Sequence, residues 1–485
     1  MEQLAIDQIV TARAAAAAGC PAARHRLDAL FDHGTFTEYG PLAGRSSDVE
    51  DDGPADGLVG GVGELGGRPV VAASYDRAVL DGTQSERNQR KLAKLIYLAR
   101  VNRWPLVLFV EGDGARPDDP LPPPPVVVTT RGRWDTLDGL AELSGWVPTV
   151  AVITGAVRDG HVAQAMLCDL VIGVAGATIG VQPRPVEQYA ARGDLDLVAA
   201  GPDEALAAVR AYLDYWFDDA GSDASAARPA PSAATIGRIV PDNRRRAYDM
   251  RALITAFADD ASVLELGRAW APSMVTALAR LEGRAIGIFA NQPLSPNAGA
   301  IDSAAADKAA RFIELCDAYE LPLVSFIDNP GYMVGPDAER GGIARHHARP
   351  LSALHHRTVP LYSVQVRKAY GLGPYAMSGY GSSRHVPQLR LAWPSVESGG
   401  MSLEGAAYLV KRKEIQAAAT PQEARAIRDA YAEQMRDVAS GVRAGRTYSF
   451  DDVLLPEETR PRIAAMLRRT TRTLPAVKKH PIDPR

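Results

Sequence analysis

Residues 363–377 read SVQVRKAYGLGPYAM, a stretch that combines the end of a strand, a turn and the start of a helix. The apolar run at 361–366 predicts a short buried strand. YGLGP at 370–374 predicts a sharp turn, and the small residues that follow can open a helix. Glycines at such a turn let backbone N–H groups face outward beside the positive end of the helix. The turn can therefore stabilise an oxygen that becomes negative in a transition state.

Glycine turns after strands are common in α/β proteins, so this one is informative mainly because the first half of the chain holds the same arrangement. A buried strand expected at 106–110 runs into EGDGAR at 111–116, and a strand expected at 150–154 is followed by RDGH at 158–161. Each half of the chain thus carries a turn of the kind that can present backbone donors.

The repeat extends over most of the chain. Arg284 lies 216 residues after Arg68 (284 − 68), and Lys308 lies 217 residues after Lys91 (308 − 91). Further pairs at similar offsets are Pro105 with Pro322, Pro148 with Pro360, and Ala165 with Ala376. A nearly constant offset indicates duplicated domains. The alternative is that two unrelated sets of α/β motifs have similar spacing by chance.

Alternating strands and helices predict an α/β protein with two tandem domains. A hairpin is expected at 58–75, and loops at 40–57 and 117–125. Helices are expected at 24–32, 85–102, 136–145, 162–168, 202–217, 421–442 and 456–473. Residues 218–234 are rich in Asp, Ala, Ser and Pro, which favours a linker. The predicted boundaries are an N-terminal domain at 1–218, a linker at 219–235 and a C-terminal domain at 236–485.

The composition favours a cytoplasmic protein with large apolar cores. Of the 485 residues 46% are hydrophobic, and the net charge of −4 gives no indication of a nucleic-acid partner or an anionic membrane. No apolar run reaches transmembrane length. AAAAAGC at 14–20 superficially resembles a lipoprotein cleavage site, but charged residues interrupt the segment before it, which favours an amphipathic helix. The three widely spaced cysteines exclude a disulfide framework within the chain and fit a reducing compartment.

Several motifs resemble those of the carboxyltransferase (β) subunits of biotin-dependent acyl-CoA carboxylases, in the crotonase-like superfamily. The second half carries most of them: IVPDN at 239–243, YDM at 248–250, ANQP at 290–293, DKAARF at 307–312, DNPGY at 328–332, GGIARH at 341–346, RKAYG at 367–371 and AWP at 392–394. The first half matches through DALFDHGTFTEYGPL at 28–42, EGDGARP at 111–117 and CD at 168–169. YGLG at 370–373 and GGMSLEGA at 399–406 resemble a divergent branch.

The resemblance implies two tandem crotonase-like domains and a reaction that moves CO2 from carboxybiotin to the α-carbon of an acyl-CoA. That reaction forms two anions, the ureido oxygen of biotin and the thioester enolate. It needs two sets of backbone donors in a dry cleft rather than a side-chain nucleophile. By position, the donors on the biotin side are the N–H groups of Leu372 and Gly373, and those on the thioester side are the N–H groups of Asp159 and Gly160.

The resemblance also implies which residues surround the two substrates. Those expected near the acyl-CoA are Gly112, Gly114, Ala115, Arg116, Arg158, His161 and Tyr375. Those expected near biotin are Pro330, Gly331, Tyr332, Tyr370 and Gly371. Tyr375 follows the turn at a position that influences the choice of acyl chain in the propionyl-type family, where a bulky side chain could narrow the pocket; the alternative is that it simply packs in the core.

Asp159 departs from the family pattern, which has small residues at this turn. A backbone N–H survives this change, but a carboxylate beside an enolate would repel it unless a cation neutralises the charge. One hypothesis is that Arg158 or His161 does so, with Arg158 paired to Asp159. The alternative is that both side chains of that pair point into solvent.

The adjacent histidine pairs at 346–347 and 355–356 lack an accompanying acidic cluster, so no metal site is expected. No ATP-grasp signature or Met-Lys-Met biotin site is visible, so the expected partner is a biotin carboxylase with its biotin carrier protein. The resemblance implies a homo-oligomer, at least a dimer and usually a hexamer. Two alternatives stay open: a non-catalytic subunit of such a complex, and a biotin-independent crotonase-like hydratase or decarboxylase that would use Asp159 as its acid or base.

Overall fold

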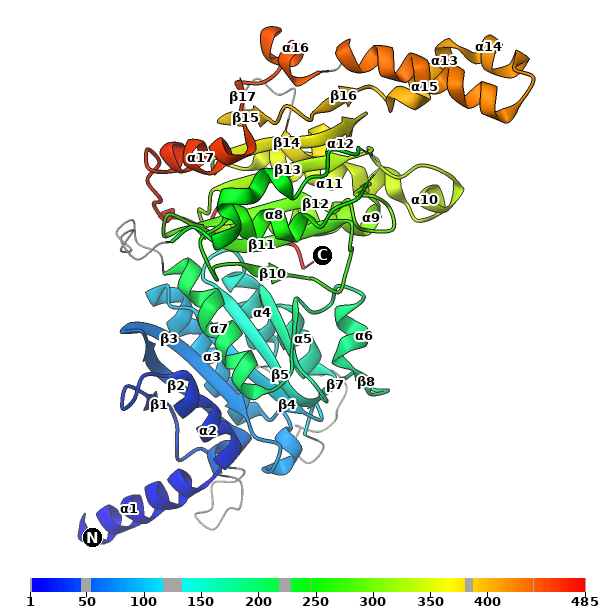
Figure 1. Ribbon diagram of the computed structural model, residues 1–485. Helices are drawn as coiled ribbons and strands as arrows, with labels where there is room; N and C mark the ends of the chain where they lie inside the picture. Colours follow the sequence, from blue (N-terminus) through cyan, green and yellow to red (C-terminus); the bar gives the residue numbers. More distant parts are fainter. Residues whose placement is uncertain are drawn as a thin grey trace. The chain divides into compact units, whose positions relative to one another are not determined.

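The computed structural model of the chain describes residues 2–44, 54–116, 133–217, 228–244, 246–379, 387–438 and 440–484. The chain forms two compact units, Met1–Phe217 with Ala476–Pro484, and Asp218–Pro475 with Arg485. Each unit is built on one sheet (Figure 1).

The first unit contains a nine-stranded sheet with the order β1-β2-β3-β4-β5-β6-β9, to which β7 and β8 add a short extension. Its elements are α1 (Glu2–Ala18), α2 (Pro21–Leu30), β1 (Thr37–Glu38), η1 (Pro54–Gly57), β2 (Leu58–Leu65), β3 (Arg68–Tyr75), η2 (Leu80–Gly82), α3 (Glu86–Asn102), β4 (Leu106–Gly112), α4 (Arg133–Leu143), β5 (Thr149–Val157), α5 (Gly160–Met166), β6 (Leu170–Val174), β7 (Thr178–Ile179), β8 (Arg184–Pro185), α6 (Val186–Ala190), β9 (Leu197–Ala199) and α7 (Pro202–Trp216).

The second unit contains an eight-stranded sheet with the order β10-β11-β12-β13-β14-β15-β17, and β16 pairs with β14. Its elements are η3 (Pro231–Arg238), α8 (Met250–Phe257), β10 (Leu264–Leu266), β11 (Met274–Leu281), β12 (Arg284–Asn291), α9 (Ser303–Ala318), β13 (Leu323–Asn329), α10 (Pro336–Arg340), α11 (Ile343–His356), β14 (Leu361–Tyr370), α12 (Gly373–Ser378), β15 (Leu389–Ala392), β16 (Glu397–Gly399), α13 (Leu403–Val410), α14 (Arg412–Ala417), α15 (Pro421–Val438), α16 (Gly441–Arg446), β17 (Asp452–Val453), η4 (Pro456–Glu458) and α17 (Thr459–Leu467). Within this unit α13, α14 and α15 form an arm that projects from the sheet (Figure 1).

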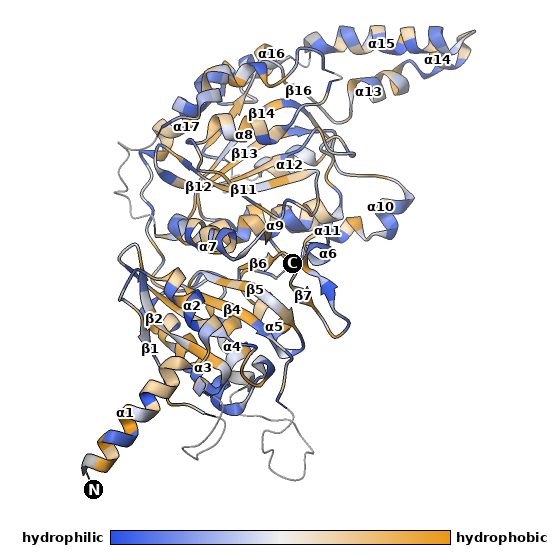
Figure 2. Ribbon diagram, turned by 60° about the horizontal axis from the view of Figure 1, so that its bottom comes forward, coloured by the Kyte–Doolittle hydropathy of each residue, from blue (hydrophilic) through white to orange (hydrophobic). Residues whose placement is uncertain are grey.

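The two sheets share one plan, which confirms the predicted duplication. In each, an antiparallel hairpin (β2–β3 or β11–β12) is followed by parallel strands, β4, β5 and β6 in the first unit and β13, β14 and β15 in the second. The β4–β5 pair shifts register between Val110 and Gly112, and the β13–β14 pair shifts between Ile327 and Asn329. The strands of both sheets are largely hydrophobic (Figure 2), as buried parallel strands require.

The recurring lysines have the same structural role in both units. The Lys91 ammonium donates to the carbonyls of Gly40, Ala55 and Leu58. The Lys308 ammonium donates to three backbone carbonyls within 3.0 Å, from Gly267 to Met274. Each lysine therefore ties the helix after the hairpin to the chain that enters the hairpin. This shared contact accounts for a lysine at the equivalent position, Lys91 and Lys308, in each half of the sequence.

Several element boundaries differ from the expected ones. The strand expected at 361–366 continues to Tyr370, and the helix expected at 162–168 begins two residues earlier, at Gly160. In the predicted linker, residues 231–235 belong to η3, because Ile236 is buried in the second core. The helix expected at 456–473 ends at Leu467. The loop expected at 117–125 and residues 219–227 of the linker lie outside the described residues.

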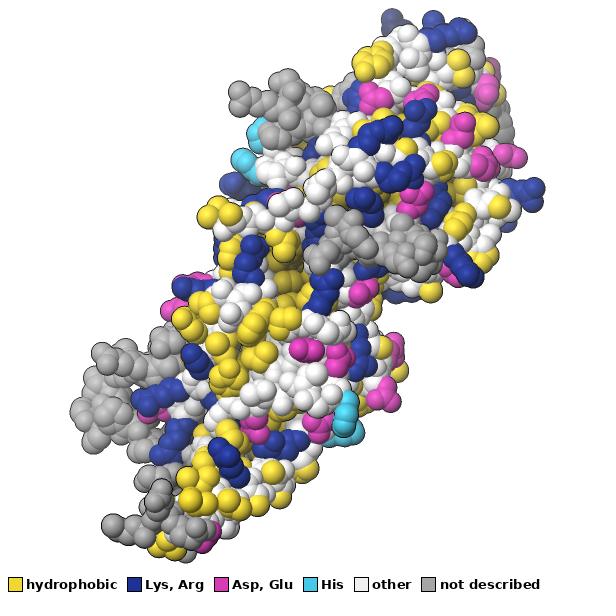
Figure 3. Space-filling view, turned by 90° about the vertical axis from the view of Figure 1, so that its left-hand side faces the viewer, with side chains coloured by type: hydrophobic (Ala, Val, Ile, Leu, Met, Phe, Trp, Pro, Cys, Tyr) yellow, Lys and Arg dark blue, Asp and Glu magenta, His cyan; other side chains and the backbone are white. Residues whose placement is uncertain are grey.

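No helix among the described residues is long and apolar enough to cross a membrane. On the face drawn in Figure 3, basic and acidic side chains are interspersed rather than segregated. This arrangement agrees with the small net charge of −4.

The three cysteines are free thiols, and all three are buried. Burial raises the pKa of Cys20 to about 11, with a further contribution from Asp76, and burial also raises the pKa of Cys168 and Cys316. Because the thiolate is the reactive form, we expect a disulfide reagent at about pH 8 to leave the native protein unmodified and to modify three thiols after unfolding. Rapid labelling of one thiol in the native protein, measured by intact mass, would contradict this burial.

Candidate active site

The N-turn, residues 157–160, joins β5 to α5. Asp159 is the residue before the helix, and its backbone has φ 47° and ψ −120°. This is a region that L side chains rarely adopt, and holding a residue in such a region costs about 1–3 kcal/mol. Among the described residues, no acceptor lies within hydrogen-bond distance of the N–H groups of Asp159 and Gly160. The N-turn therefore offers two adjacent donors at the start of a helix.

Closely packed backbone and side-chain atoms support the N-turn. Gly112, at the end of β4, has φ 145°, and a Cβ there would lie 2.3 Å from the carbonyl oxygen of Gly82. A Cβ on Gly114 would lie 2.8 Å from Oδ2 of Asp159, and one on Gly160 would lie 2.2 Å from Oε1 of Gln84. The two glycine segments predicted in the first half therefore lie against each other. Gly112 is required there, because its backbone has φ 145° and the carbonyl of Gly82 occupies the space of a side chain.

Arg158 does not form the hypothesised pair with Asp159. Its Nε lies 3.8 Å from Oδ1 of Asp113, and the same oxygen lies 3.1 Å from the guanidinium of Arg77. The correction has a steric reason, because the backbone of Asp159 turns its carboxylate onto Gly114 instead. Asp159 is exposed next to the two donors, and its carboxylate forms no ion pair with another residue that the structure describes.

His161 and Arg116 are held by protein groups rather than directed into an open site. The buried His161 ring lies with Nε2 2.9 Å from the carbonyl oxygen of Gly82, and it packs edge-on against Tyr75. The buried Arg116 guanidinium donates to Oδ1 of Asp56 at 2.6 Å. Both residues therefore brace the loops beneath the N-turn. Ala115, by contrast, is exposed.

The C-turn, residues 370–373, joins β14 to α12 in the second unit. Gly371 has φ 58°, and its N–H donates to the carbonyl of Gly399 on β16 at 3.0 Å. Leu372 precedes the helix with φ −84°, and Gly373 is its first residue. As far as the chain is described, the N–H groups of Leu372 and Gly373 have no acceptor. The C-turn thus presents a second pair of donors, with glycine at its positive-φ position.

The segment after β13 packs under the C-turn. Oδ1 of Asn329 accepts from the N–H of Gly331 at 3.0 Å, and a Cβ on Gly373 would lie 2.0 Å from this oxygen. Gly331 has φ 111° and lies against the carbonyl of Tyr370. The DNPGY and RKAYG motifs therefore meet at one point. Pro330 is exposed there, and the hydroxyl of Tyr332 donates to the carbonyl of His347 at 3.1 Å.

A buried charge cluster lies beneath this meeting point. Oδ2 of Asp328 lies 3.1 Å from Nε of Arg367, and Oδ1 lies 3.1 Å from Nζ of Lys368. Asp328 is completely buried, and the side chain of Arg367 is 5% exposed. The guanidinium of Arg367 also covers the ring of Tyr248 at 5.1 Å. One buried carboxylate of the first motif thus pairs with two cations of the second inside the unit.

Tyr370 points away from the C-turn into a second polar network. Its hydroxyl donates to Oε1 of the buried Glu397, and both burial and this bond raise its pKa. Oε2 of Glu397 accepts from Arg244 at 3.3 Å and from Arg436 on α15 at 3.4 Å. The network fixes the last residue of β14 and therefore the entry to the C-turn.

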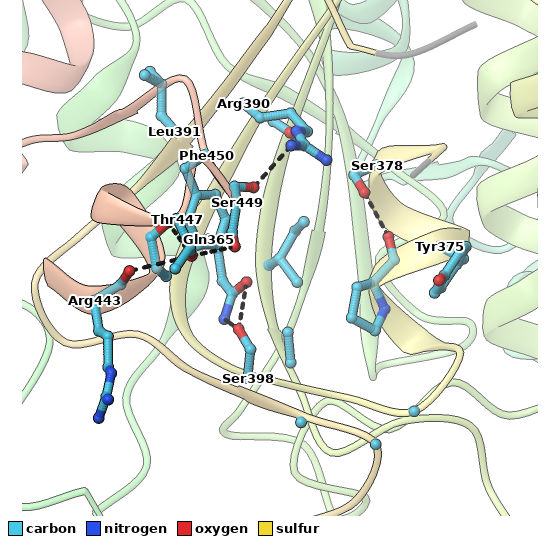
Figure 4. Close-up of a pocket in the computed structure, with 18 residues that line it drawn as sticks. Gln365, Tyr375, Ser378, Arg390, Leu391, Ser398, Arg443, Thr447, Ser449 and Phe450 are labelled. Atoms are coloured by element: carbon cyan, nitrogen blue, oxygen red, sulfur yellow. Dashed lines mark hydrogen bonds between the residues drawn. The ribbon is translucent and has the colours of Figure 1, made fainter. Parts of the chain in front are cut away.

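A cavity of about 590 Å³ lies beside the C-turn (Figure 4). Tyr375 and Ser378 of α12 lie on one side, and Arg443, Thr447, Ser449 and Phe450 lie on the other. Gln365 and Ser398 contribute amide and hydroxyl groups to its wall, joined by a 2.8 Å hydrogen bond. Tyr375 thus faces a cavity rather than the core.

The histidine pairs have protein partners or neighbours. Nδ1 of His346 lies 2.8 Å from Oδ1 of Asp307, and the ring of His347 stacks on that of Tyr332 at 3.8 Å. Burial and the neighbouring His346 lower the pKa of His347. Within the part of the chain that the structure describes, no group of three or more His, Cys, Asp or Glu residues is arranged to hold a metal.

Sequence reasoning missed three residues that shape the two turns: Gln84, Asn329 and Glu397. Asn329 belongs to the DNPGY motif, which is the sequence signal that could have placed it near the C-turn. Gln84 and Glu397 carry no local signal, because each contacts a turn that is distant in the sequence. Gln84 precedes Gly160 by 76 residues (160 − 84), and Glu397 follows Gly373 by 24 residues (397 − 373).

Comparison with known proteins assigns the family. The model of the carboxyl transferase domain matches residues 15–188 and 186–481. The chain is 32% identical to the methylmalonyl-CoA carboxyltransferase 12S subunit of Propionibacterium freudenreichii subsp. shermanii, over 95% of this chain and 91% of that protein. It is also 32% identical to the propionyl-CoA carboxylase beta chain of Roseobacter denitrificans, over 94% of this chain and 92% of that one.

Solved structures agree with this assignment. The crystal structure of the transcarboxylase 12S hexamer with methylmalonyl-coenzyme A bound has a TM-score of 0.83 and 31% identity, and covers 98% of this chain and 97% of its own. A single-chain, multi-domain long-chain acyl-CoA carboxylase has a TM-score of 0.84 and 35% identity over 95% of this chain and 48% of its own. These structures confirm the predicted fold class, an α/β protein of two tandem crotonase-like domains. The chain belongs to the carboxyl transferase family and is a carboxyltransferase of the biotin-dependent acyl-CoA carboxylase type.

Proposed function

We propose that this chain transfers a carboxyl group between carboxybiotin on a partner carrier protein and the α-carbon of an acyl-CoA. The observation that carries the proposal is the presence of two turns, one in each duplicated unit, that each leave two backbone N–H groups without an acceptor among the described residues. The reaction forms two anions, and each turn is suited to stabilise one of them.

The N-turn is assigned to the thioester. The N–H groups of Asp159 and Gly160 stabilise the enolate oxygen, and Gly112 and Gly114 allow the loops around the N-turn to pack closely. Arg158, exposed to 38% and at a distance of 3.8 Å from Asp113, is available to the anionic part of the coenzyme. His161 and Arg116 position the surrounding loops.

The C-turn is assigned to biotin. The N–H groups of Leu372 and Gly373 stabilise the ureido oxygen, and Gly331, Tyr332 and Gly371 shape the surface around them. Tyr375 faces the 590 Å³ cavity beside the turn, which supports a role in selecting the group that enters it. Biotin is the only cofactor assigned besides the coenzyme A of the substrate, and no metal is assigned to this chain.

The partner we assign is a biotin carboxylase with its biotin carrier protein, because the relatives include beta chains of propionyl-CoA carboxylase. A homo-oligomer is proposed as well, since the related transcarboxylase 12S assembles as a hexamer. A cytoplasmic location is supported by three free, buried cysteines.

A carboxyl-exchange assay tests the proposal. Purified protein receives malonyl-CoA or methylmalonyl-CoA, with and without free biotin or a biotinylated carrier, and loss of the carboxyl group is followed. We expect decarboxylation that depends on biotin. Decarboxylation without biotin would indicate a decarboxylase instead, and a folded, oligomeric protein with no turnover on either substrate would favour the non-catalytic subunit.

A further inference from the structure

A short strand beside the C-turn, β16, holds the turn in two ways. The carbonyl of Gly399 accepts from the N–H of Gly371 at 3.0 Å, and Oε1 of Glu397 accepts from the hydroxyl of Tyr370. Tyr370 and Glu397 are both 6% exposed. The two residues that lead into the donor pair of the C-turn are therefore fixed by β16, one through its backbone and one through a side chain.

The first unit builds the equivalent turn with apolar residues at these positions. The last residue of β5, Val157, and the last residue of β14, Tyr370, each lie three residues before a helix and pair with the end of a short neighbouring strand, β7 or β16. Two residues back from that pairing partner lies Ala177 in the first unit and Glu397 in the second (179 − 2 and 399 − 2). Val157 and Ala177 belong to the apolar core of the first unit. The fold by itself therefore does not require a tyrosine and a carboxylate there.

The arm of α13, α14 and α15 (Figure 1) supplies one of the cations that hold Glu397. Nε of Arg436, on α15, donates to Oε2 of Glu397 at 3.4 Å, and Nη2 donates to Glu404 on α13 at 3.2 Å. Arg244, outside the arm, donates to the same Oε2 at 3.3 Å. A buried ion pair is weak evidence for stability, because desolvation offsets the attraction. What Arg436 contributes is a connection between two helices of the arm and the strand that holds the C-turn.

We propose that Glu397 is a positioning residue for the biotin half of the reaction, and that the arm acts on the C-turn through Arg436, Glu397 and Tyr370. The carboxylate holds the end of β14 where the N–H groups of Leu372 and Gly373 face the ureido oxygen. Glu397 acts through Tyr370 and touches no reacting atom. The inference rests on the proposed biotin site, and it adds that a displacement of the arm moves the donors of the C-turn.

Arg436→Met breaks the link at the arm. The kcat of biotin-dependent malonyl-CoA decarboxylation should fall about 10-fold, because a donor displaced by less than about 1 Å already stabilises the transition state poorly. The KM for malonyl-CoA should stay unchanged, since the N-turn is intact. Arg436→Lys retains a cation and should recover part of the loss. Arg428→Met is the matched control: Arg428 lies eight residues earlier on α15 (436 − 428) and pairs with the adjacent Asp429, so kcat should not change.

Tyr370→Phe breaks the same link at its other end. It removes only the hydroxyl that donates to Glu397, and it should also lower kcat about 10-fold. The double variant with Tyr370→Phe and Arg436→Met should lose no more than the larger single loss, because either substitution already breaks the connection. Independent effects would multiply to about 100-fold, and that result would overturn the coupling.

Amide hydrogen exchange in fragments that contain residues 370–373 gives a readout that does not depend on turnover. Exchange should quicken in Arg436→Met and in Tyr370→Phe, because the bond from Gly371 to Gly399 opens more often when the end of β14 is released. It should stay unchanged in Arg428→Met.

The outcomes separate this inference from the proposed function. Unchanged kcat in Arg436→Met and Tyr370→Phe would overturn the positioning role of Glu397 and leave the carboxyltransferase in place. Faster exchange in these variants, with no biotin-dependent turnover by the unsubstituted protein, would overturn the proposed function and support the coupling of the arm to the C-turn. Neither turnover nor a change in exchange would overturn both.

Discussion

Replacing Asp328 by alanine should lower the free energy of unfolding of the second unit by about 3–5 kcal/mol. The carboxylate is completely buried and lies 3.1 Å from both Arg367 and Lys368. Its removal leaves a guanidinium that is 5% exposed, and an ammonium, without their buried counter-charge. A buried charge that has lost its partner costs far more than the original pair contributes. Chemical denaturation followed by circular dichroism measures the change.

Two further variants show whether the loss comes from the unpaired cations. Asp337→Ala removes an acid whose side chain is 96% exposed and whose partner, Arg340, lies on the same helix, so it should have little measurable effect. Combining Asp328→Leu with Arg367→Met removes opposite charges together and should recover part of the stability lost in Asp328→Ala. An Asp328→Ala protein as stable as the Asp337→Ala protein would contradict the buried cluster.

The duplicated fold could be predicted because its landmarks are local and recur at one spacing. Lys91 and Lys308 each sit on the helix after a hairpin, and each binds the carbonyls that lead into that hairpin. Strand and helix signals around these lysines, such as the apolar run 106–110, lie within a few residues of one another, so periodicity alone reveals them.

The details of the two turns could not be predicted, because they depend on contacts between distant segments. The partner of Arg158 is Asp113, which is 45 residues away (158 − 113), rather than the adjacent Asp159. The positive φ of Asp159 arises where β5 ends and α5 begins, and no neighbouring residue in the sequence signals it. Side-chain directions at a turn follow from φ and ψ, which residue spacing does not specify.

The two units share one fold, but the turns that carry their backbone donors differ in local backbone conformation. At the C-turn the positive-φ residue is Gly371, two positions before the helix, whereas at the N-turn it is Asp159, directly before the helix. The two turns therefore present their N–H pairs with different local backbones. This difference is consistent with two distinct anions, one in a ureido ring and one in a thioester.

Replacing Gly373 by alanine should reduce biotin-dependent carboxyl transfer by about 100-fold or more, the loss typical of one oxyanion donor. The added Cβ would lie 2.0 Å from Oδ1 of Asn329. That oxygen cannot move freely, because it accepts from the N–H of Gly331 at 3.0 Å and its amide nitrogen donates to Asn291 at 3.0 Å. The turn must therefore shift, and the N–H groups of Leu372 and Gly373 leave the positions in which they stabilise the ureido oxygen.

The defect of Gly373→Ala should be confined to the biotin half-reaction. Its biotin-dependent decarboxylation of malonyl-CoA should fall, while its affinity for acyl-CoA, measured by calorimetry, stays unchanged because the N-turn is intact. Gly201→Ala is the matched control, since that glycine has an extended backbone with φ −168° and no atom within 4 Å of the added Cβ. Full carboxyl transfer by Gly373→Ala would mean that the C-turn tolerates displacement, and an oxyanion role for its N–H groups would then be untenable.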